Sequence, residues 1–288
     1  MSNPYLNPQR VCAALRTLEL RPTRGMGQNF LVDDDALAAI VAAAEPNAND
    51  LVVEVGPGLG VLTWELTQRA GHTVAVELDR RLAARLREEF VSAPLTIVEA
   101  DVLRVTPGAL LEAGGQAATA PYKLIANLPY AITSAVLRHF LEASAPPSLS
   151  VLLVQWEVAQ RITAKVGDLS ILAHAVQIYA EAEIVAQVPA TSFIPAPAVA
   201  SAILRLRRRP ALAVEVDDLD QLFRVIKAGF HQARKQLGNA LPHGLATQGR
   251  PASREQVLSA LAAAGVAPQQ RAETVTLQQW ALVAQVLR

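Results

Sequence analysis

The residues best suited to chemistry form the tetrapeptide Asn127-Leu128-Pro129-Tyr130, which follows a short apolar run. The side-chain carbonyl of Asn127 and the backbone carbonyl of Leu128 can accept hydrogen bonds from an exocyclic amine, which favours a pyramidal, more nucleophilic nitrogen. Pro129 restrains the loop by fixing its own φ, and Tyr130 offers a face on which a planar base can stack. Alone, such a tetrapeptide is more typical of a plain turn, so its surroundings must decide.

A glycine-rich turn provides the second candidate site. Gly56, Gly58 and Gly60 follow an apolar run and precede a helical pattern, so the backbone can turn tightly and a ligand can approach it closely. Glu77 stands about twenty residues after the first glycine, where a carboxylate can accept both hydroxyls of a ribose. The G-x-G-x-G spacing departs from the dinucleotide fingerprint, whose third glycine is replaced by Val61. This favours S-adenosylmethionine over NAD.

Three further features each allow two interpretations. Asp101 follows the third apolar run and could accept a hydrogen bond from an adenine amine, or it could cap a turn. Polar Gln28 and Asn29, next to Leu31, could line a lid over the cofactor or form an ordinary loop. Phe193 precedes a pair of prolines and could stack on a flipped base, or it could be a hydrophobic plug.

The elements that must position these residues are predicted from apolar periodicity. Short apolar runs alternate with amphipathic segments, which predicts an α/β fold with a parallel sheet covered by helices on both faces. The runs span residues 51–55, 73–76, 95–98, 122–125 and 149–155. Ligands bind at the carboxyl edge of such sheets, where the glycine turn and the tetrapeptide are expected. Residues 183–188 and 200–206 predict a hairpin at one edge of the sheet.

The pattern changes after Pro210, where only helical segments recur. We therefore predict a Rossmann-like catalytic domain over residues 1–209 and a small all-α domain over residues 210–288.

Composition narrows the possible settings of the chain. Its 288 residues include one cysteine, Cys12, and no Cys/His cluster with zinc-ligand spacing, so we expect neither a disulfide nor a metal. The N-terminus lacks the apolar core of a secretory signal, and the apolar stretches are too short to span a bilayer. The sequence therefore predicts a cytoplasmic protein without membrane contact.

Net charge alone argues against a nucleic-acid partner, because 26 basic residues balance 26 acidic ones. The basic residues are nevertheless clustered, and RNA contacts are predicted at Arg207, Arg208, Arg234 and Lys235. An ordinary solvated surface is the alternative.

Ordered motifs extend over nearly the whole chain. They are Gly27-Gln28-Asn29-Phe30-Leu31, Glu54-Val55-Gly56-Pro57-Gly58, Asn127-Leu128-Pro129-Tyr130, the spaced set Phe193, Pro195, Pro197, Val199, Ser201 and Ala202, the spaced set Phe230, Arg234, Lys235, Leu237, Asn239 and Leu241, and Arg271-Ala272-Glu273-Thr274. In these motifs the sequence resembles the ribosomal RNA adenine dimethyltransferases, and among them the small-subunit KsgA/RsmA family. The resemblance implies a class I methyltransferase fold and a monomer that acts on 16S rRNA in an immature 30S particle. The implied reaction is dimethylation of the N6 amines of two adjacent adenosines near the 3′ end, with S-adenosylmethionine.

The resemblance also assigns roles to residues. It implies a cofactor site made of Gln28, Asn29, Leu31, Gly56, Gly58, Glu77, Leu78, Asp101, Val102 and Asn127. Tyr130 and Phe193 would bracket the adenine. Three departures from the family pattern are Met26 in place of an aromatic residue, Ala233 in place of an arginine, and Asp168 where an arginine is common. Two of them remove positive charge.

Three other functions share some of these features. A 23S rRNA adenine N6-methyltransferase of the macrolide-resistance type would use the same cofactor and amine chemistry, but the C-terminal motifs fit the small-subunit family better. A non-catalytic ribosome-assembly factor would need neither Asn127 nor the glycine turn. A nicotinamide dehydrogenase is disfavoured by the glycine spacing.

Overall fold

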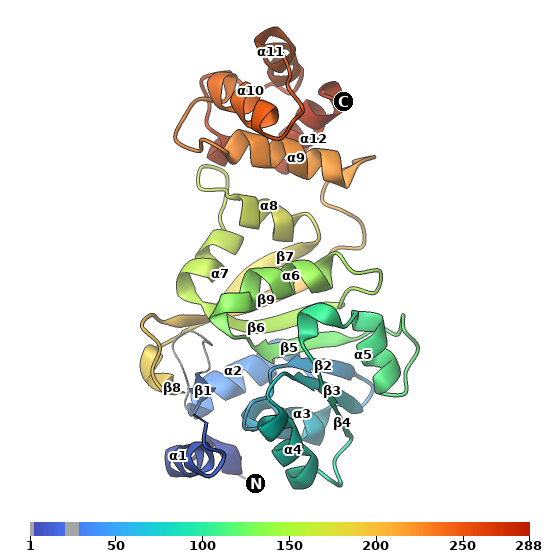
Figure 1. The fold of residues 1–288 in the computed structure, drawn as a ribbon, viewed down its shortest axis with the longest axis vertical. Coiled ribbons are helices and arrows are strands. Elements are labelled where there is room, and N and C mark those ends of the chain that lie inside the picture. The colour runs from blue at the N-terminus through green and yellow to red at the C-terminus, as the bar shows by residue number, and fades with distance from the viewer. Residues whose placement is uncertain (1–2, 21–28) are drawn as a thin grey trace. The chain divides into compact units, whose positions relative to one another are not determined.

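The computed structural model describes residues 3–20 and 29–288, and it divides into two compact units (Figure 1). The first unit comprises residues up to Ala159 together with Ala182–Arg208, and the second comprises Gln160–Glu181 and Arg209–Arg288. The division after residue 208 lies next to the domain boundary that the sequence suggested. The segment 160–181 differs, because it groups with the helical unit, where Ile178 belongs to the buried core.

A seven-stranded sheet organises the first unit, in the order β4-β3-β2-β5-β6-β9-β7. The strands are β2 (Leu51–Val55), β3 (His72–Glu77), β4 (Leu95–Glu99), β5 (Lys123–Asn127), β6 (Leu149–Gln155), β7 (Ala180–Val188) and β9 (Ser201–Arg208). β2 to β6 pair in parallel, whereas β9 runs antiparallel to β6. β7 and β9 are neighbours at one edge, which confirms the predicted edge hairpin.

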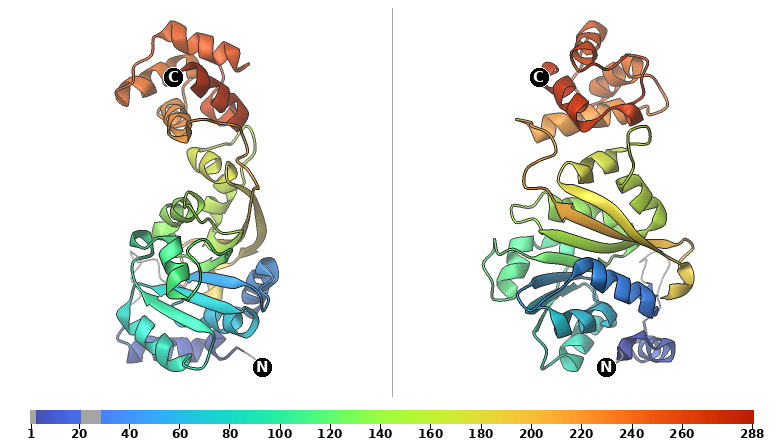
Figure 2. Two further views of the ribbon diagram at one scale, coloured as in Figure 1. Left: turned by 90° about the vertical axis from the view of Figure 1, so that its right-hand side faces the viewer. Right: turned by 180° about the vertical axis from the view of Figure 1, so that it is seen from behind.

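Helices lie on both faces of this sheet, with α2 on one face and α6 on the other (Figure 2). The helices of this part of the chain are α1 (Pro8–Thr17), α2 (Asp34–Ala44), α3 (Val61–Arg69), α4 (Arg80–Glu89), α5 (Pro107–Ala113), α6 (Thr133–Leu141) and α7 (Trp156–Ile162). Every residue of β2 is buried, as expected for a central parallel strand covered on both sides. The predicted α/β fold class is confirmed.

A separate two-stranded sheet joins distant segments of the first unit. β1 (Phe30–Leu31) pairs antiparallel with β8 (Phe193–Ile194), so that Leu31 lies opposite Phe193 (Figure 1). This pairing was not predictable from the sequence, because strands of two residues have no periodicity.

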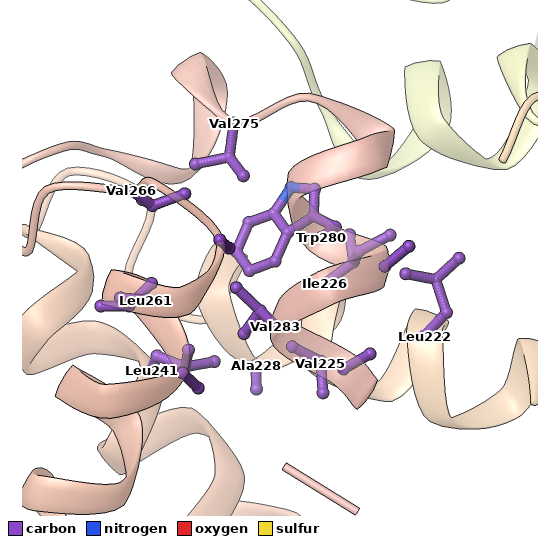
Figure 3. Close-up of a cluster of buried hydrophobic side chains, with 14 of the residues drawn as sticks. Leu222, Val225, Ile226, Ala228, Leu241, Leu261, Val266, Val275, Trp280 and Val283 are labelled. Atoms are coloured by element: carbon purple, nitrogen blue, oxygen red, sulfur yellow. The ribbon is translucent and has the colours of Figure 1, made fainter. Parts of the chain in front are cut away.

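The second unit is helical. It contains α8 (Ile171–Gln177), α9 (Leu219–Phe230), α10 (Leu237–Thr247), α11 (Arg254–Ala263) and α12 (Leu277–Val286). Their apolar side chains surround the fully buried Trp280 (Figure 3). Packing is close enough that a Cβ on Gly229 would lie 2.3 Å from the indole ring of Trp280.

Across residues 3–20 and 29–288, no helix has the length and apolar character needed to cross a bilayer. The same residues contain no group of three or more His, Cys, Asp or Glu side chains arranged to hold a metal ion.

Candidate active site

A pocket lies at the carboxyl edge of the sheet, where the ends of β2, β3 and β5 meet the segment around β1. It brings together most of the residues that the sequence singled out. The predicted site residues in its lining are Asn29, Leu31, Gly56, Gly58, Glu77, Asn127, Leu128, Pro129 and Tyr130.

The glycine turn adopts a backbone conformation that L-residues avoid. Gly56, Gly58 and Gly60 have φ values of 67°, 59° and 89°. A Cβ on Gly58 would lie 3.2 Å from the ring of Phe30, and one on Gly60 would lie 2.9 Å from the ring of Phe90. These glycines are therefore required both by the turn and by the side chains that pack on it.

Glu77 is held in place by the backbone of two loops. Its Oε2 accepts a hydrogen bond from the Gly58 N–H at 3.1 Å, and its Oε1 accepts one from the Asp79 N–H at 2.9 Å. Burial raises the pKa of Glu77, although both N–H groups favour its charged form. Each carboxylate oxygen retains a lone pair for a ligand, which suits a role in holding ribose hydroxyls.

A second carboxylate in the lining, Glu54, was not identified from the sequence. It is 1% exposed, and its Oε2 accepts a hydrogen bond from the Thr63 hydroxyl at 2.7 Å. Burial raises the pKa of Glu54 to about 8, while the Thr63 hydroxyl lowers it and the nearby charge of Glu77 raises it. The available signal was an acid inside the otherwise apolar strand β2, directly before the glycine turn.

The Asp, Glu, Lys, Arg and His side chains that line the pocket are all acidic. The lining contains the carboxylates of Glu54 and Glu77, whereas none of the described residues that line it is Lys, Arg or His. Burial raises the pKa of both acids, and a cationic ligand would favour their ionised forms, so the pocket is electrostatically suited to a positively charged molecule.

Asn127 ends β5, and its orientation is set by a hydrogen bond. Its Nδ2 donates to the backbone carbonyl of Asn29 at 3.0 Å. Because only the amide nitrogen can donate to a carbonyl, the side-chain oxygen is left to accept a hydrogen bond from a ligand.

The rest of the tetrapeptide is anchored to neighbouring strands. The Leu128 N–H donates to the carbonyl of Leu153 at 3.2 Å, and the Leu128 side chain is buried. The hydroxyl of the half-buried Tyr130 lies 2.6 Å from Oγ of Ser201, and burial raises the pKa of Tyr130.

Several predicted site residues lie outside the lining of this pocket. Phe193 is 3% exposed, and its ring packs in the hydrophobic cluster that contains Leu31 and Leu37. Asp101 caps a short 3-10 helix through a hydrogen bond from the Leu103 N–H at 3.0 Å, which is the second interpretation left open by the sequence.

The remaining predicted cofactor residues differ in their exposure to solvent. Val102 is buried, Leu78 is 72% exposed directly after Glu77, and Gln28 lies outside the described residues. An apolar side chain as exposed as Leu78 at the edge of this pocket is available to contact a ligand.

The four predicted RNA-binding residues are all exposed. Arg207 and Arg208 end β9, and Arg234 and Lys235 lie in the turn between α9 and α10. Their side chains are therefore accessible to a partner.

The chain is similar to known proteins over nearly its whole length. A family model described as ribosomal RNA adenine dimethylase matches residues 21–287. Ribosomal RNA small subunit methyltransferase A of Dehalococcoides mccartyi is 43% identical over 265 residues, covering 92% of this chain and 88% of the relative. The protein of the same name from Moorella thermoacetica is 40% identical and covers 98% of each chain.

Two solved structures are also similar. The 23S rRNA methyltransferase ErmE matches with a TM-score of 0.68 and 31% identity, covering 90% of this chain and 99% of the neighbour. A dimethyladenosine transferase from Plasmodium falciparum matches with a TM-score of 0.73 and 22% identity, covering 88% and 95%. The second likeness concerns the fold alone.

Proposed function

Since the chain belongs to the ribosomal RNA adenine dimethylase family, and is therefore an S-adenosylmethionine-dependent rRNA adenine dimethyltransferase, we propose that its substrate is small-subunit rRNA. Family membership confirms the resemblance drawn from the ordered motifs. The proposed reaction dimethylates the N6 amines of two adjacent adenosines near the 3′ end of 16S rRNA. The observation that carries the chemistry is the hydrogen bond that fixes the Asn127 carboxamide beside a pocket lined by two acidic side chains.

The acidic side chains that line the pocket fit the charge of the cofactor. S-adenosylmethionine supplies, when bound, an electrophilic methyl group on a sulfonium that already carries positive charge. Glu54 and Glu77, when ionised, would complement that positive charge. Glu77 would hold the ribose hydroxyls, with Asp101 at the adenine amine.

The other proposed cofactor contacts surround these two acids. Leu78 and Val102 would flank the adenine ring. The remaining contacts are proposed at Gln28, Asn29, Leu31, Gly56, Gly58 and Asn127.

The tetrapeptide would present the target amine. The free side-chain oxygen of Asn127 and the backbone carbonyl of Leu128 would accept hydrogen bonds from the two N–H groups of N6. Asn127 has no titrating group near neutral pH, so it orients the amine and does not act as a base. The protein's main contribution is then alignment of nitrogen, carbon and sulfur.

Two aromatic residues are proposed to hold the base. Tyr130 lines the pocket, and its hydroxyl is already fixed near Ser201. A stacking role for Phe193 on the other face requires its ring to leave the cluster around Leu31.

The setting of the reaction is proposed from the same family membership. We propose a cytoplasmic monomer that acts on an immature 30S particle and contacts RNA through Arg207, Arg208, Arg234 and Lys235. We propose that residues 1–209 form the catalytic domain and that residues 210–288 form the domain that docks on RNA.

Primer extension across both large rRNAs from a deletion strain tests the choice of substrate. We expect loss of the modification stops in 16S rRNA and unchanged 23S rRNA, with the 16S stops restored by the wild-type gene. Intact 16S dimethylation together with loss of a 23S modification would instead assign the chain to the macrolide-resistance type of enzyme.

A further inference from the structure

Two segments that lie 159 residues apart are fastened together beside the candidate active site. β1 and β8 pair as a two-stranded sheet, and next to it the Val32 N–H donates to the carbonyl of Ser192 at 2.9 Å. The Ser192 hydroxyl then donates to Oδ2 of Asp33 at 2.5 Å. We refer to the hydrogen bond between these two side chains as the latch.

The two partners of the latch are chemically well matched. Asp33 uses its other oxygen, Oδ1, to accept the Ala36 N–H at 3.0 Å and so caps α2. Ser192 is 3% exposed, so its hydroxyl has little access to water if the bond is broken. The hydrogen bond from Ser192, followed by that from Ala36, lowers the pKa of Asp33. The latch is therefore a charge-assisted bond to an ionised carboxylate.

The latch lies only a few residues from the group that orients Asn127. The carbonyl that accepts the Asn127 Nδ2–H belongs to Asn29, which directly precedes β1. Movement of β1 would therefore shift that carbonyl and change the direction of the Asn127 side-chain oxygen.

We propose that Ser192 and Asp33 are positioning residues, whose hydrogen bond fixes the backbone of Asn29 and thereby aims Asn127 at the target amine. The proposal rests on the proposed function, because it assigns the latch to the same methyl-transfer step. Neither residue is among those that line the pocket, so both act through Asn127 and not on the substrate.

The Ser192→Ala variant separates this role from simple stabilisation. It removes the latch but leaves the Asp33 cap of α2 and the β1–β8 pairing in place. We expect kcat on 30S particles to fall about tenfold, the ratio that corresponds to about 1.4 kcal/mol, while the Kd for S-adenosylmethionine changes by less than about twofold. Ser192→Thr keeps a hydroxyl at the same position and is expected to recover most of kcat.

Two further variants keep the test decisive. Asp33→Asn retains an oxygen for the cap and exchanges the charged acceptor for an amide, so an intermediate loss of kcat is expected. This variant still tests the latch if Ser192→Ala folds poorly. Ser148→Ala is the matched control, because it removes another serine hydroxyl of the first unit, which donates to the Tyr122 carbonyl at 2.9 Å. Its kcat is expected to stay at the wild-type value.

The experiment measures kcat, the cofactor Kd by calorimetry, and the melting temperature for every variant. A wild-type kcat in Ser192→Ala would overturn the proposed role of the latch. A loss of cofactor affinity and melting temperature that parallels the loss of kcat would also overturn it. If the wild-type protein itself forms no dimethyladenosine in 16S rRNA, the proposed function fails, which is a different outcome from an active wild type with an active Ser192→Ala variant.

Discussion

Replacing Glu54 with Gln tests whether the active-site pocket stores unfavourable negative charge. The substitution keeps the shape of the side chain and an oxygen for the hydrogen bond from Thr63, but it removes the ionisable group. The folded-state pKa of Glu54 is about 8, above the value of 4.5 for an unperturbed glutamate. Below pH 4.5 the side chain is protonated in both states, so the acid costs nothing there.

The loss of folding stability caused by burying Glu54 develops as pH rises. Between pH 4.5 and about 8 the folded state binds more protons than the unfolded state, so the free energy of unfolding of the wild type falls with pH. A shift of this size corresponds to about 5 kcal/mol when both states have fully titrated. Glu54→Gln does not carry this penalty, so it should gain stability relative to wild type as pH increases from 5 to 9.

Urea unfolding of both proteins at pH 5, 7 and 9, without cofactor, measures the effect. The variant is expected to gain several kcal/mol relative to wild type between the lowest and the highest pH. Glu99→Gln, at the end of β4 where the side chain is 38% exposed, is the control and should show no such gain. A stability difference between Glu54→Gln and wild type that stays constant with pH would refute the reasoning.

Three other predictions concern catalysis, RNA binding and packing. Asn127→Ala should lower kcat about a hundredfold and leave the calorimetric Kd for S-adenosylmethionine much less affected; normal dimethylation by this variant would remove the orienting role. Neutralising Arg234 and Lys235 should weaken RNA binding and lower the slope of log Kd against log salt by about one for each lost phosphate contact. An unchanged slope would exclude both from the RNA surface. Gly229→Ala should destabilise the helical unit by about 1–3 kcal/mol in chemical unfolding, because the added Cβ would lie 2.3 Å from Trp280; wild-type stability would contradict this packing.

The sheet was largely predictable because its central strands are short, apolar and buried on both faces. β2 and β6 have the predicted bounds of residues 51–55 and 149–155. The glycine turn and the tetrapeptide then had to lie near each other, since both follow parallel strands that end at the same edge.

What the sequence could not provide are features that depend on tertiary contacts. The β1–β8 pairing joins two short segments that have no hydrophobic periodicity. The hydrogen bond from Asn127 to Asn29 and the latch, which depend on this pairing, were therefore not predictable. The position of Glu54 in an apolar strand before the glycine turn was visible in the sequence, but its burial beside Glu77 was not. Phe193 was recognised by its motif, but the motif does not say that its ring packs in a hydrophobic cluster.

The most direct test of the central claim is methyl transfer onto 30S particles isolated from a strain that lacks this modification. The particles are incubated with the wild-type protein and S-adenosylmethionine, and 16S rRNA is digested for nucleoside analysis by mass spectrometry. We expect two N6,N6-dimethyladenosines per 16S rRNA, at adjacent positions near the 3′ end, and far fewer with Asn127→Ala. Absence of dimethyladenosine from 16S rRNA, with its appearance in 23S rRNA treated in parallel, would contradict it.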